Sequence, residues 1–184
     1  MKPSTFAIGG GVGIAALGVL GVLFGIFPFP QRADITLTVS SDALIAIPKS
    51  TGNHEDCQDP QQVGCVHVFK GRSANIKFLL DGLDGWKFKR MQLVAESEDN
   101  PDKLNFIQKA NLTPEMVEDF YVKIKSARIH PDEYGIIDLT GLKDGTKFRL
   151  IDKNKYAQNY FYQIEACNGD CKQTDPKIEN EGKN

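Results

Sequence analysis

Four cysteines are the residues of this chain best suited to covalent chemistry: Cys57, Cys65, Cys167 and Cys171. An even number of cysteines in an exported domain predicts two disulfides, although spacing alone leaves three pairings open. We favour the local pairing, in which each cysteine bonds its nearest neighbour in the sequence. Asn168-Gly169 predicts a tight turn between the second pair, and Pro60 and Gly64 are turn-forming residues inside the first.

A zinc site is the main alternative for the same four cysteines. Structural zinc sites usually place about two to four residues between the cysteines of a pair, whereas seven residues separate Cys57 from Cys65. Redox catalysis would favour C-x-x-C, and Cys167-Asn-Gly-Asp-Cys171 has one residue too many. The sequence therefore favours structural disulfides, and it predicts neither a metal nor another cofactor.

The remaining polar residues form no recognisable catalytic pattern. The histidines His54, His67 and His130 make neither H-x-x-x-H nor H-E-x-x-H. His67 alternates with valines, which is typical of an exposed strand residue. No serine lies in the G-x-S-x-G turn of hydrolases. The carboxylates of Glu96–Asp102 lack the EF-hand pattern, so we interpret them as a loop. The sequence predicts a protein that is not an enzyme.

An uncharged run from Phe6 to Phe29, FAIGGGVGIAALGVLGVLFGIFPF, is the strongest pattern in the chain. As a helix it would span about 36 Å, enough for a hydrocarbon core of about 30 Å. A cleaved signal peptide is the alternative, but such peptides have a shorter apolar core and a small-x-small cleavage site, which PFPQRAD lacks. We predict a retained membrane helix in residues 1–30. Because Lys2 precedes the run, the N-terminus is expected in the cytoplasm and the body outside it.

Glycines recur within this run at helical spacing: Gly11, Gly18, Gly21 and Gly25. Small residues let two helices approach closely in lipid, so we expect these glycines to contact another transmembrane helix. That helix would belong to a second copy of the chain or to a different subunit. The alternative is that the glycines only reflect the higher glycine content of membrane helices.

Charge is balanced in the rest of the chain. Of 22 Lys+Arg, all but Lys2 lie in residues 31–184, where 21 cationic side chains face 24 Asp+Glu and give a net charge of −3. No basic run stands out, which argues against nucleic acid as a partner. Nor does the sequence show a polybasic cluster near the membrane that would attract anionic lipids. The length of this segment fits one compact domain.

Short runs in which apolar and polar residues alternate dominate the chain after residue 30, and they predict strands. The expected strands are 34–40, 43–47, 65–70, 74–80, 86–94, 104–107, 120–126, 136–139, 148–151 and 160–166. Alternation from Trp86 needs a slip to bring Leu93 inward together with Phe88. Thr113 and Pro114 predict the start of one short helix.

The spacing of these strands, without a βαβ rhythm, predicts a mainly β fold. We expect an antiparallel β-sandwich of the immunoglobulin-like kind in residues 31–171. Residues 172–184 are polar and are predicted to be a frayed tail.

The last third of the chain carries three linked patterns: Phe148-x-Leu-x-Asp152-x-Asn154, Tyr160-x-Tyr162-x-Ile164 and Asp175-Pro-x-Ile-x-Asn180. In these it resembles small bacterial exported β-sandwich proteins such as the DP-EP family. The resemblance implies an exported sandwich and no established chemistry, so it assigns no catalytic residue.

These patterns together predict a single-pass protein of the inner (plasma) membrane with a periplasmic or extracellular β-domain. We expect a non-catalytic accessory or assembly subunit of a membrane protein complex, whose partners are other transmembrane helices or its own copy. The alternative is a freestanding module on a membrane tether that binds a ligand or peptide through loops such as 50–64.

Overall fold

The computed structural model describes residues 29–40, 43–49, 57, 64–97, 106, 110–174 and 177–182. In this part of the chain the fold is mainly β, and the only helix is the short α2 (Pro114–Val117). The helix begins as predicted. The Thr113 side chain accepts a hydrogen bond from the backbone N–H of Met116 (3.3 Å), and Pro114 occupies the first turn, where its missing N–H costs nothing.

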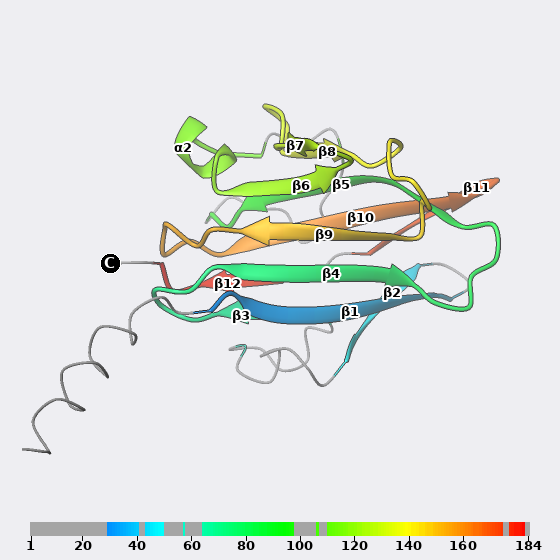
Figure 1. The fold of residues 1–184 in the computed structure, drawn as a ribbon, viewed down its shortest axis with the longest axis horizontal. Helices are drawn as coiled ribbons and strands as arrows, with labels where there is room; N and C mark the ends of the chain where they lie inside the picture. Colours follow the sequence, from blue (N-terminus) through cyan, green and yellow to red (C-terminus); the bar gives the residue numbers. More distant parts are fainter. Residues whose placement is uncertain are drawn as a thin grey trace, which may run out of the picture.

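Two sheets make up the domain (Figure 1). The first sheet has the order β2-β1-β4-β9-β6-β7, with β1 (Gln31–Val39), β2 (Leu44–Lys49), β4 (Ala74–Leu80), β6 (Phe120–Ile124), β7 (Ala127–Ile129) and β9 (Lys147–Asp152). The second has the order β3-β12-β10-β5-β8, with β3 (Val66–Val68), β5 (Lys87–Ala95), β8 (Ile136–Asp138), β10 (Tyr160–Asn168) and β12 (Lys177–Asn180). β11 (Asp170–Thr174) pairs with the C-terminal half of β10.

The sheets are mixed, so the prediction of a purely antiparallel sandwich is wrong for two pairs of strands. β1 pairs with β4 in parallel, and β12 pairs with β3 in parallel. After β2 the chain contributes β3 to the second sheet before it returns to the first sheet as β4, so β4 enters in the same direction as β1. Alternation reports which side chains are buried but not the direction of a strand.

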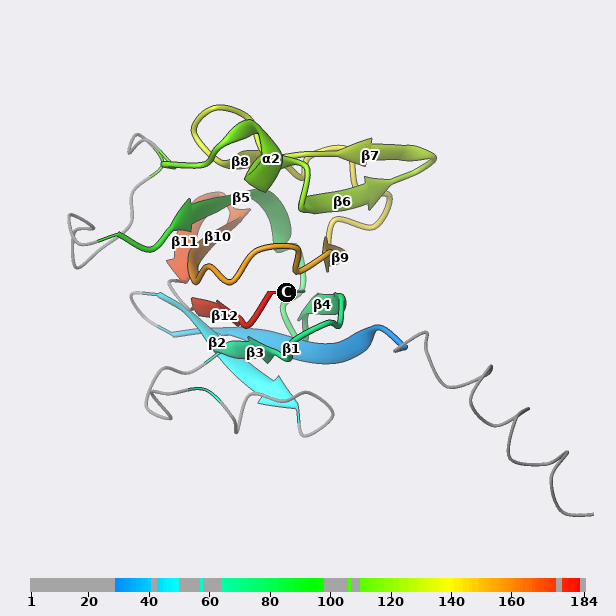
Figure 2. The ribbon, with the colours of Figure 1, turned by 90° about the vertical axis from the view of Figure 1, so that its left-hand side faces the viewer.

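Aromatic side chains from both sheets meet in the core between them. The ring centres of Phe78 and Tyr162 are 5.4 Å apart, and those of Phe120 and Tyr160 are 4.7 Å apart, both edge to face. All four side chains are fully buried, and such aromatic pairs add about 1 kcal/mol each to their burial. Figure 2 views the sandwich from the end where β1 begins, with β4 and β9 on one side and β5 and β10 on the other.

The slip predicted in the strand after Trp86 is a β-bulge. Arg90 lies opposite Glu165, but the next pair is Phe88 opposite Ala166, which leaves Lys89 as the extra residue. Because of this extra residue, Phe88 and Met91 both point into the core although they are three residues apart. Leu93 is fully buried, as expected.

Residues 172–174 and 177–182 are not a frayed tail, so this prediction is wrong for the described part of the segment. β11 extends to Thr174, and β12 lies inside the second sheet between β3 and β10. Ile178 fills a fully buried position in the core. The charged neighbours of Ile178 point to the other face of the sheet, where they form ion pairs. The domain therefore continues past the boundary predicted at residue 171.

The local disulfide pairing is confirmed. Cys57 bonds Cys65, with 6.4 Å between their Cα atoms, and Cys167 bonds Cys171 across the β10–β11 hairpin at 4.1 Å. Gly169 turns this hairpin with φ of 78°, a conformation that favours glycine. With all four thiols bonded, a four-cysteine zinc site is excluded.

No helix in the described ranges has both the length and the apolar character needed to cross a bilayer. The predicted membrane helix, with Gly11, Gly18, Gly21 and Gly25, lies almost wholly in residues 1–28, outside those ranges. The described chain begins with Phe29, whose side chain is 89% exposed.

The start of β1 is held by the Gln31–Asn154 cluster, a group of hydrogen bonds at one end of the sandwich. The Gln31 side chain donates to the carbonyl of His67 and accepts from the N–H of Phe69. The buried Asn154 side chain donates to the carbonyl of Phe69 (2.9 Å) and accepts from the N–H of Gly182 (2.9 Å). The cluster therefore joins the first residue of β1 to the second sheet and to the last described residues.

Candidate functional site

Cationic side chains from three strands meet on the outer face of the first sheet. In β1, Ala33 and Ile35 are buried, so Arg32 and Asp34 point outward. The parallel register places Asp34 opposite Lys77 in β4, and the antiparallel register places Lys77 opposite Arg149 in β9. Residues far apart in the sequence are thus brought to one place by strand pairing.

Five side chains line a pocket of about 260 Å³ on this face: Arg32, Asp34, Asn75, Lys77 and Arg149. We call it the cationic pocket, because three positive charges face a single carboxylate. Within the described part of the chain, no ion pair joins any of the five to another residue. Guanidinium, ammonium and amide groups are the donors that bind oxyanions, and arginine can bind a phosphate or carboxylate with two parallel hydrogen bonds.

The positive charge continues along the same face. Lys123 in β6 lies opposite Arg128 in β7, and both are exposed. Lys147 precedes the cationic pocket in β9 and is paired with Asp144 (3.1 Å). Among the outward positions of the described strands in this sheet, Asp34 is the only acidic residue. The outer face of the first sheet is therefore basic, although the domain as a whole is slightly acidic.

On the outer face of the second sheet, the charges of Arg90 and Glu165 neutralise one another. Arg90 donates two hydrogen bonds to Glu165, from Nε (3.0 Å) and from an Nη atom (3.1 Å). Gln173 donates a third to Glu165 (2.9 Å), and the Glu165 carboxylate is only 9% exposed. The Arg90 guanidinium also lies 3.8 Å from the centre of the Phe106 ring. These contacts hold the side chains in place, so the role of Arg90 and Glu165 is structural.

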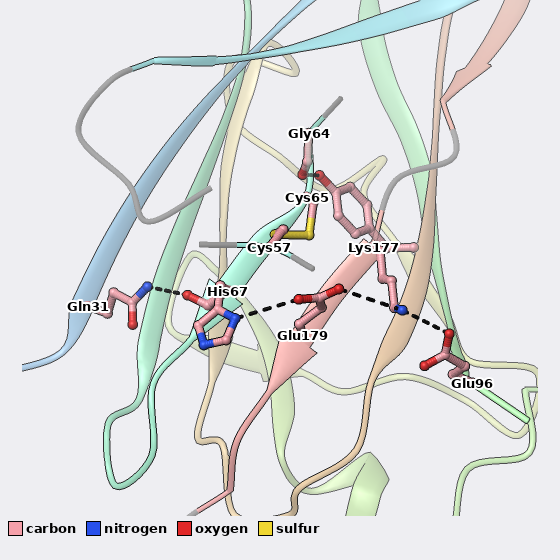
Figure 3. Close-up of a disulfide and its surroundings, with 9 residues drawn as sticks. Gln31, Cys57, Gly64, Cys65, His67, Glu96, Lys177 and Glu179 are labelled. Atoms are coloured by element: carbon pink, nitrogen blue, oxygen red, sulfur yellow. Dashed lines mark hydrogen bonds and ion pairs between the residues drawn. A yellow bond between two sulfur atoms is a disulfide. The ribbon is translucent and has the colours of Figure 1, made fainter. Parts of the chain in front are cut away.

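A second group of charges on this face runs from β3 across β12 to the end of β5 (Figure 3). His67 lies 3.6 Å from Glu179 and 3.1 Å from Glu181. Lys177 lies 3.7 Å from Glu179 and 2.8 Å from Glu96. We call these five residues the His67–Glu96 network.

Two carboxylates of the His67–Glu96 network have lowered pKa values. Burial by itself would raise the pKa of Glu96, but hydrogen bonds from Lys177 and Asn159 and the charge of Lys177 hold that pKa below its ordinary value. The pKa of Glu181 is lowered mainly by a hydrogen bond from the backbone N–H of Lys70. Both carboxylates therefore favour the charged form in the folded protein.

The Cys57–Cys65 disulfide lies beside this network (Figure 3). Next to Cys65, the carbonyl of Gly64 accepts a hydrogen bond from the hydroxyl of Tyr162 (2.7 Å). Tyr162 is fully buried, and burial raises the pKa of this phenol well above its ordinary value. The disulfide thus fastens Cys57 to the second sheet close to the buried Glu179.

The predicted chemistry-bearing residues are distributed as follows. His67 points away from the core, opposite in direction to Val66 and Val68, as its alternation predicted, but it is half-buried and paired. His130 lies within hydrogen-bonding distance of the carbonyl of Val117 (3.3 Å). His54 lies outside the described residues. The two cysteines of each pair are bonded to each other, and no bond links one pair to the other.

A second hollow of similar size, about 280 Å³, lies beside the Cys167–Cys171 disulfide. Lys87, Lys89 and Lys143 contribute to its lining, together with Phe88 and Leu142. It resembles the cationic pocket in its number of positive charges but lies at the other sheet. This makes its lysines a matched control for the cationic pocket.

Neither models of protein families nor curated protein sequences match the chain. The resemblance to the DP-EP family therefore stays a prediction.

Sequence reasoning missed the cationic pocket. In each contributing strand polar residues alternate with buried ones, as in Arg32-Ala-Asp34 and Asn75-Ile-Lys77. That signal marks an outward position, but it does not reveal which strands are neighbours. No basic run marks the pocket in the sequence, because its three cations come from three separate strands, β1, β4 and β9.

Proposed function

We propose that the protein is a non-catalytic accessory or assembly subunit of a membrane protein complex. A single N-terminal helix anchors it in the inner (plasma) membrane. The N-terminus lies in the cytoplasm, and the immunoglobulin-like β-sandwich lies in the periplasm or outside the cell. The anchor's partner is a transmembrane helix of another subunit or of a second copy.

One observation carries the proposal: β1 begins at Gln31, two residues after the apolar run ends at Phe29. Gln31 is itself fixed by the Gln31–Asn154 cluster. A domain attached without a linker cannot move far from its anchor. This favours a protein that works against the membrane surface and against neighbouring subunits.

Two further observations support the proposal. The disulfides are typical of proteins in oxidising compartments outside the cytoplasm. Phe29 is exposed at the junction between the apolar run and β1, and aromatic side chains are enriched where membrane helices meet water.

The test is co-purification from native membranes in mild detergent. We expect the full-length protein to retain partner subunits, and Gly18→Leu, Gly21→Leu and Gly25→Leu together to reduce their recovery. The control changes the opposite face of the same helix, with Leu20→Ala, Leu23→Ala and Phe27→Ala, and should keep the partners. A free monomer in detergent, with nothing captured by crosslinking in intact cells, would contradict the proposal.

The cationic pocket favours a second candidate, a freestanding binding module for an anionic ligand on a membrane tether. This candidate predicts that the full-length protein, reconstituted alone in nanodiscs, binds a soluble anionic ligand. It also predicts that the protein purified from native membranes carries no protein partner. Co-purification of a stable complex would favour the subunit instead.

A further inference from the structure

The position of the cationic pocket on the first sheet allows an inference about the membrane itself. Because β1 and β4 are parallel, the N-terminal ends of both strands lie at the same end of the sheet (Figure 1). The register places Arg32 opposite Asn75 at that end. This is also the end at which the chain arrives from the apolar run.

Arg32 follows Phe29 by three residues, which places their Cα atoms at most about 10 Å apart. The headgroup layer on each side of a bilayer is about 5–7 Å thick outside the hydrocarbon core. If the core ends near Phe29, then Arg32 lies at the headgroups or just beyond them. Lys77 and Arg149 lie two residues further along the strand direction, an offset of about 7 Å from the level of Arg32. Long cationic side chains can extend back toward the interface.

The charge of the pocket also favours a ligand in the membrane. A domain with a net charge of −3 would be repelled by an anionic bilayer if its charge were evenly spread. Instead, three cations are concentrated near the membrane-proximal end of one sheet face, without ion pairs to other described residues. Each lysine or arginine close to an anionic surface contributes about 1 kcal/mol of attraction, a factor of about five.

We propose that the cationic pocket binds the phosphate group of an anionic phospholipid in the leaflet next to the β-domain. Arg32 and Arg149 would donate hydrogen bonds to the phosphate oxygens, with Lys77 as a further charge and Asn75 as a neutral donor. Asp34 would keep the pocket from being uniformly positive. This inference rests on the proposed membrane anchor, and it adds a lipid to the partners of the protein.

The test uses the full-length protein in nanodiscs that contain equal amounts of phosphatidylcholine and phosphatidylglycerol. Lipids that stay bound after release are counted by native mass spectrometry. We expect phosphatidylglycerol to exceed phosphatidylcholine by at least about fivefold, the effect of one cation. The triple variant Arg32→Gln, Lys77→Gln and Arg149→Gln should bring the ratio close to one.

The matched control is Lys87→Gln, Lys89→Gln and Lys143→Gln, which removes the same charge from the hollow at the other sheet. It should keep the wild-type ratio. If both triple variants lose the preference equally, or if the wild type shows none, the proposal is wrong. Should the first triple variant fold poorly, Arg149→Gln alone is the replacement, because Arg149 is exposed and makes no ion pair with a described residue.

Two added measurements separate the lipid from other occupants and from the anchor. Inorganic phosphate or a polyglutamate peptide is added to the wild type and to the control triple variant. If either competitor displaces phosphatidylglycerol equally from both proteins, so that the control lysines play no part, the ligand is a soluble anion or an acidic protein segment, and the lipid is wrong. Extraction of membranes with alkaline carbonate tests the anchor separately. Release of the protein by carbonate would overturn both proposals, whereas a retained protein without lipid preference would overturn only this one.

Discussion

On the outer face of the second sheet, Arg90 is bound to Glu165, and Lys177 is bound to Glu96 and Glu179. On the outer face of the first sheet, Arg32, Lys77 and Arg149 share a pocket without an ion pair to any described residue. Both faces are made by the same alternation of buried and outward residues. The difference shows that the paired charges of the second sheet stabilise the fold, while those of the cationic pocket stay available.

The largest loss of stability is expected from the disulfide beside the His67–Glu96 network. Cys57→Ser with Cys65→Ser should lower the free energy of unfolding by about 2–3 kcal/mol, because the unfolded chain loses the constraint of a short closed loop. Thermal unfolding followed by circular dichroism measures the change. A loss below that of Cys167→Ser with Cys171→Ser, whose loop is shorter, would show that Cys57 does not fasten the second sheet.

A smaller loss is expected from the bidentate pair in the same face. Glu165→Ala removes the acceptor of two hydrogen bonds from Arg90 and one from Gln173. Since the Arg90 side chain is 38% exposed, water can replace part of the interaction, and we expect a cost of about 1.5 kcal/mol. The control is Asp144→Ala, which breaks the exposed pair with Lys147 and should cost less than about 0.5 kcal/mol. Equal costs would remove the distinction between the faces.

Acid should weaken the second face before the first. The folded pKa values of Glu96 and Glu181 lie below the ordinary value of 4.5. Their contribution to stability is therefore full above that value and is lost as the pH falls through the lowered pKa values. Melting temperatures measured between neutral pH and about pH 3 should decline less steeply for Glu96→Gln than for the wild type. Lys77 of the cationic pocket makes no ion pair with a described carboxylate, so Lys77→Gln should leave the slope unchanged.

The smallest change in stability is expected from the cationic pocket itself. Arg32→Gln, Lys77→Gln and Arg149→Gln together should alter the free energy of unfolding by less than about 0.5 kcal/mol, because these side chains stabilise no described partner. Urea unfolding measures this change. Destabilisation as large as that of Glu165→Ala would mean that the pocket is structural, and the two faces would then be alike.

The sequence allowed prediction of what depends on neighbouring residues. Thr113 and Pro114 marked the helix, and the cysteine spacing favoured the pairing that the structure has. The slip before Leu93 indicated the bulge at Lys89. Each of these features is decided within about ten residues of chain, so the local pattern contains the signal.

Features that depend on distant strands escaped prediction. In β12 only Ile178 is apolar. The charged residues of β12 are accommodated because His67 pairs with Glu179 and Glu96 pairs with Lys177, and both partners come from distant parts of the sequence. The cationic pocket likewise exists only after β1, β4 and β9 have become neighbours. Burial patterns say which way a side chain points, but strand order decides which side chains point together.

The interior position of β1 in the first sheet, between β2 and β4, has a mechanical consequence. β1 is paired on both sides, with β2 and with β4, and its hydrogen bonds run across the strand direction. Tension that enters from Phe29 pulls along β1 and loads both rows of bonds in shear at once, whereas an edge strand pulled sideways would open one bond at a time. The domain is thus built to bear load through the residue at which the predicted anchor ends.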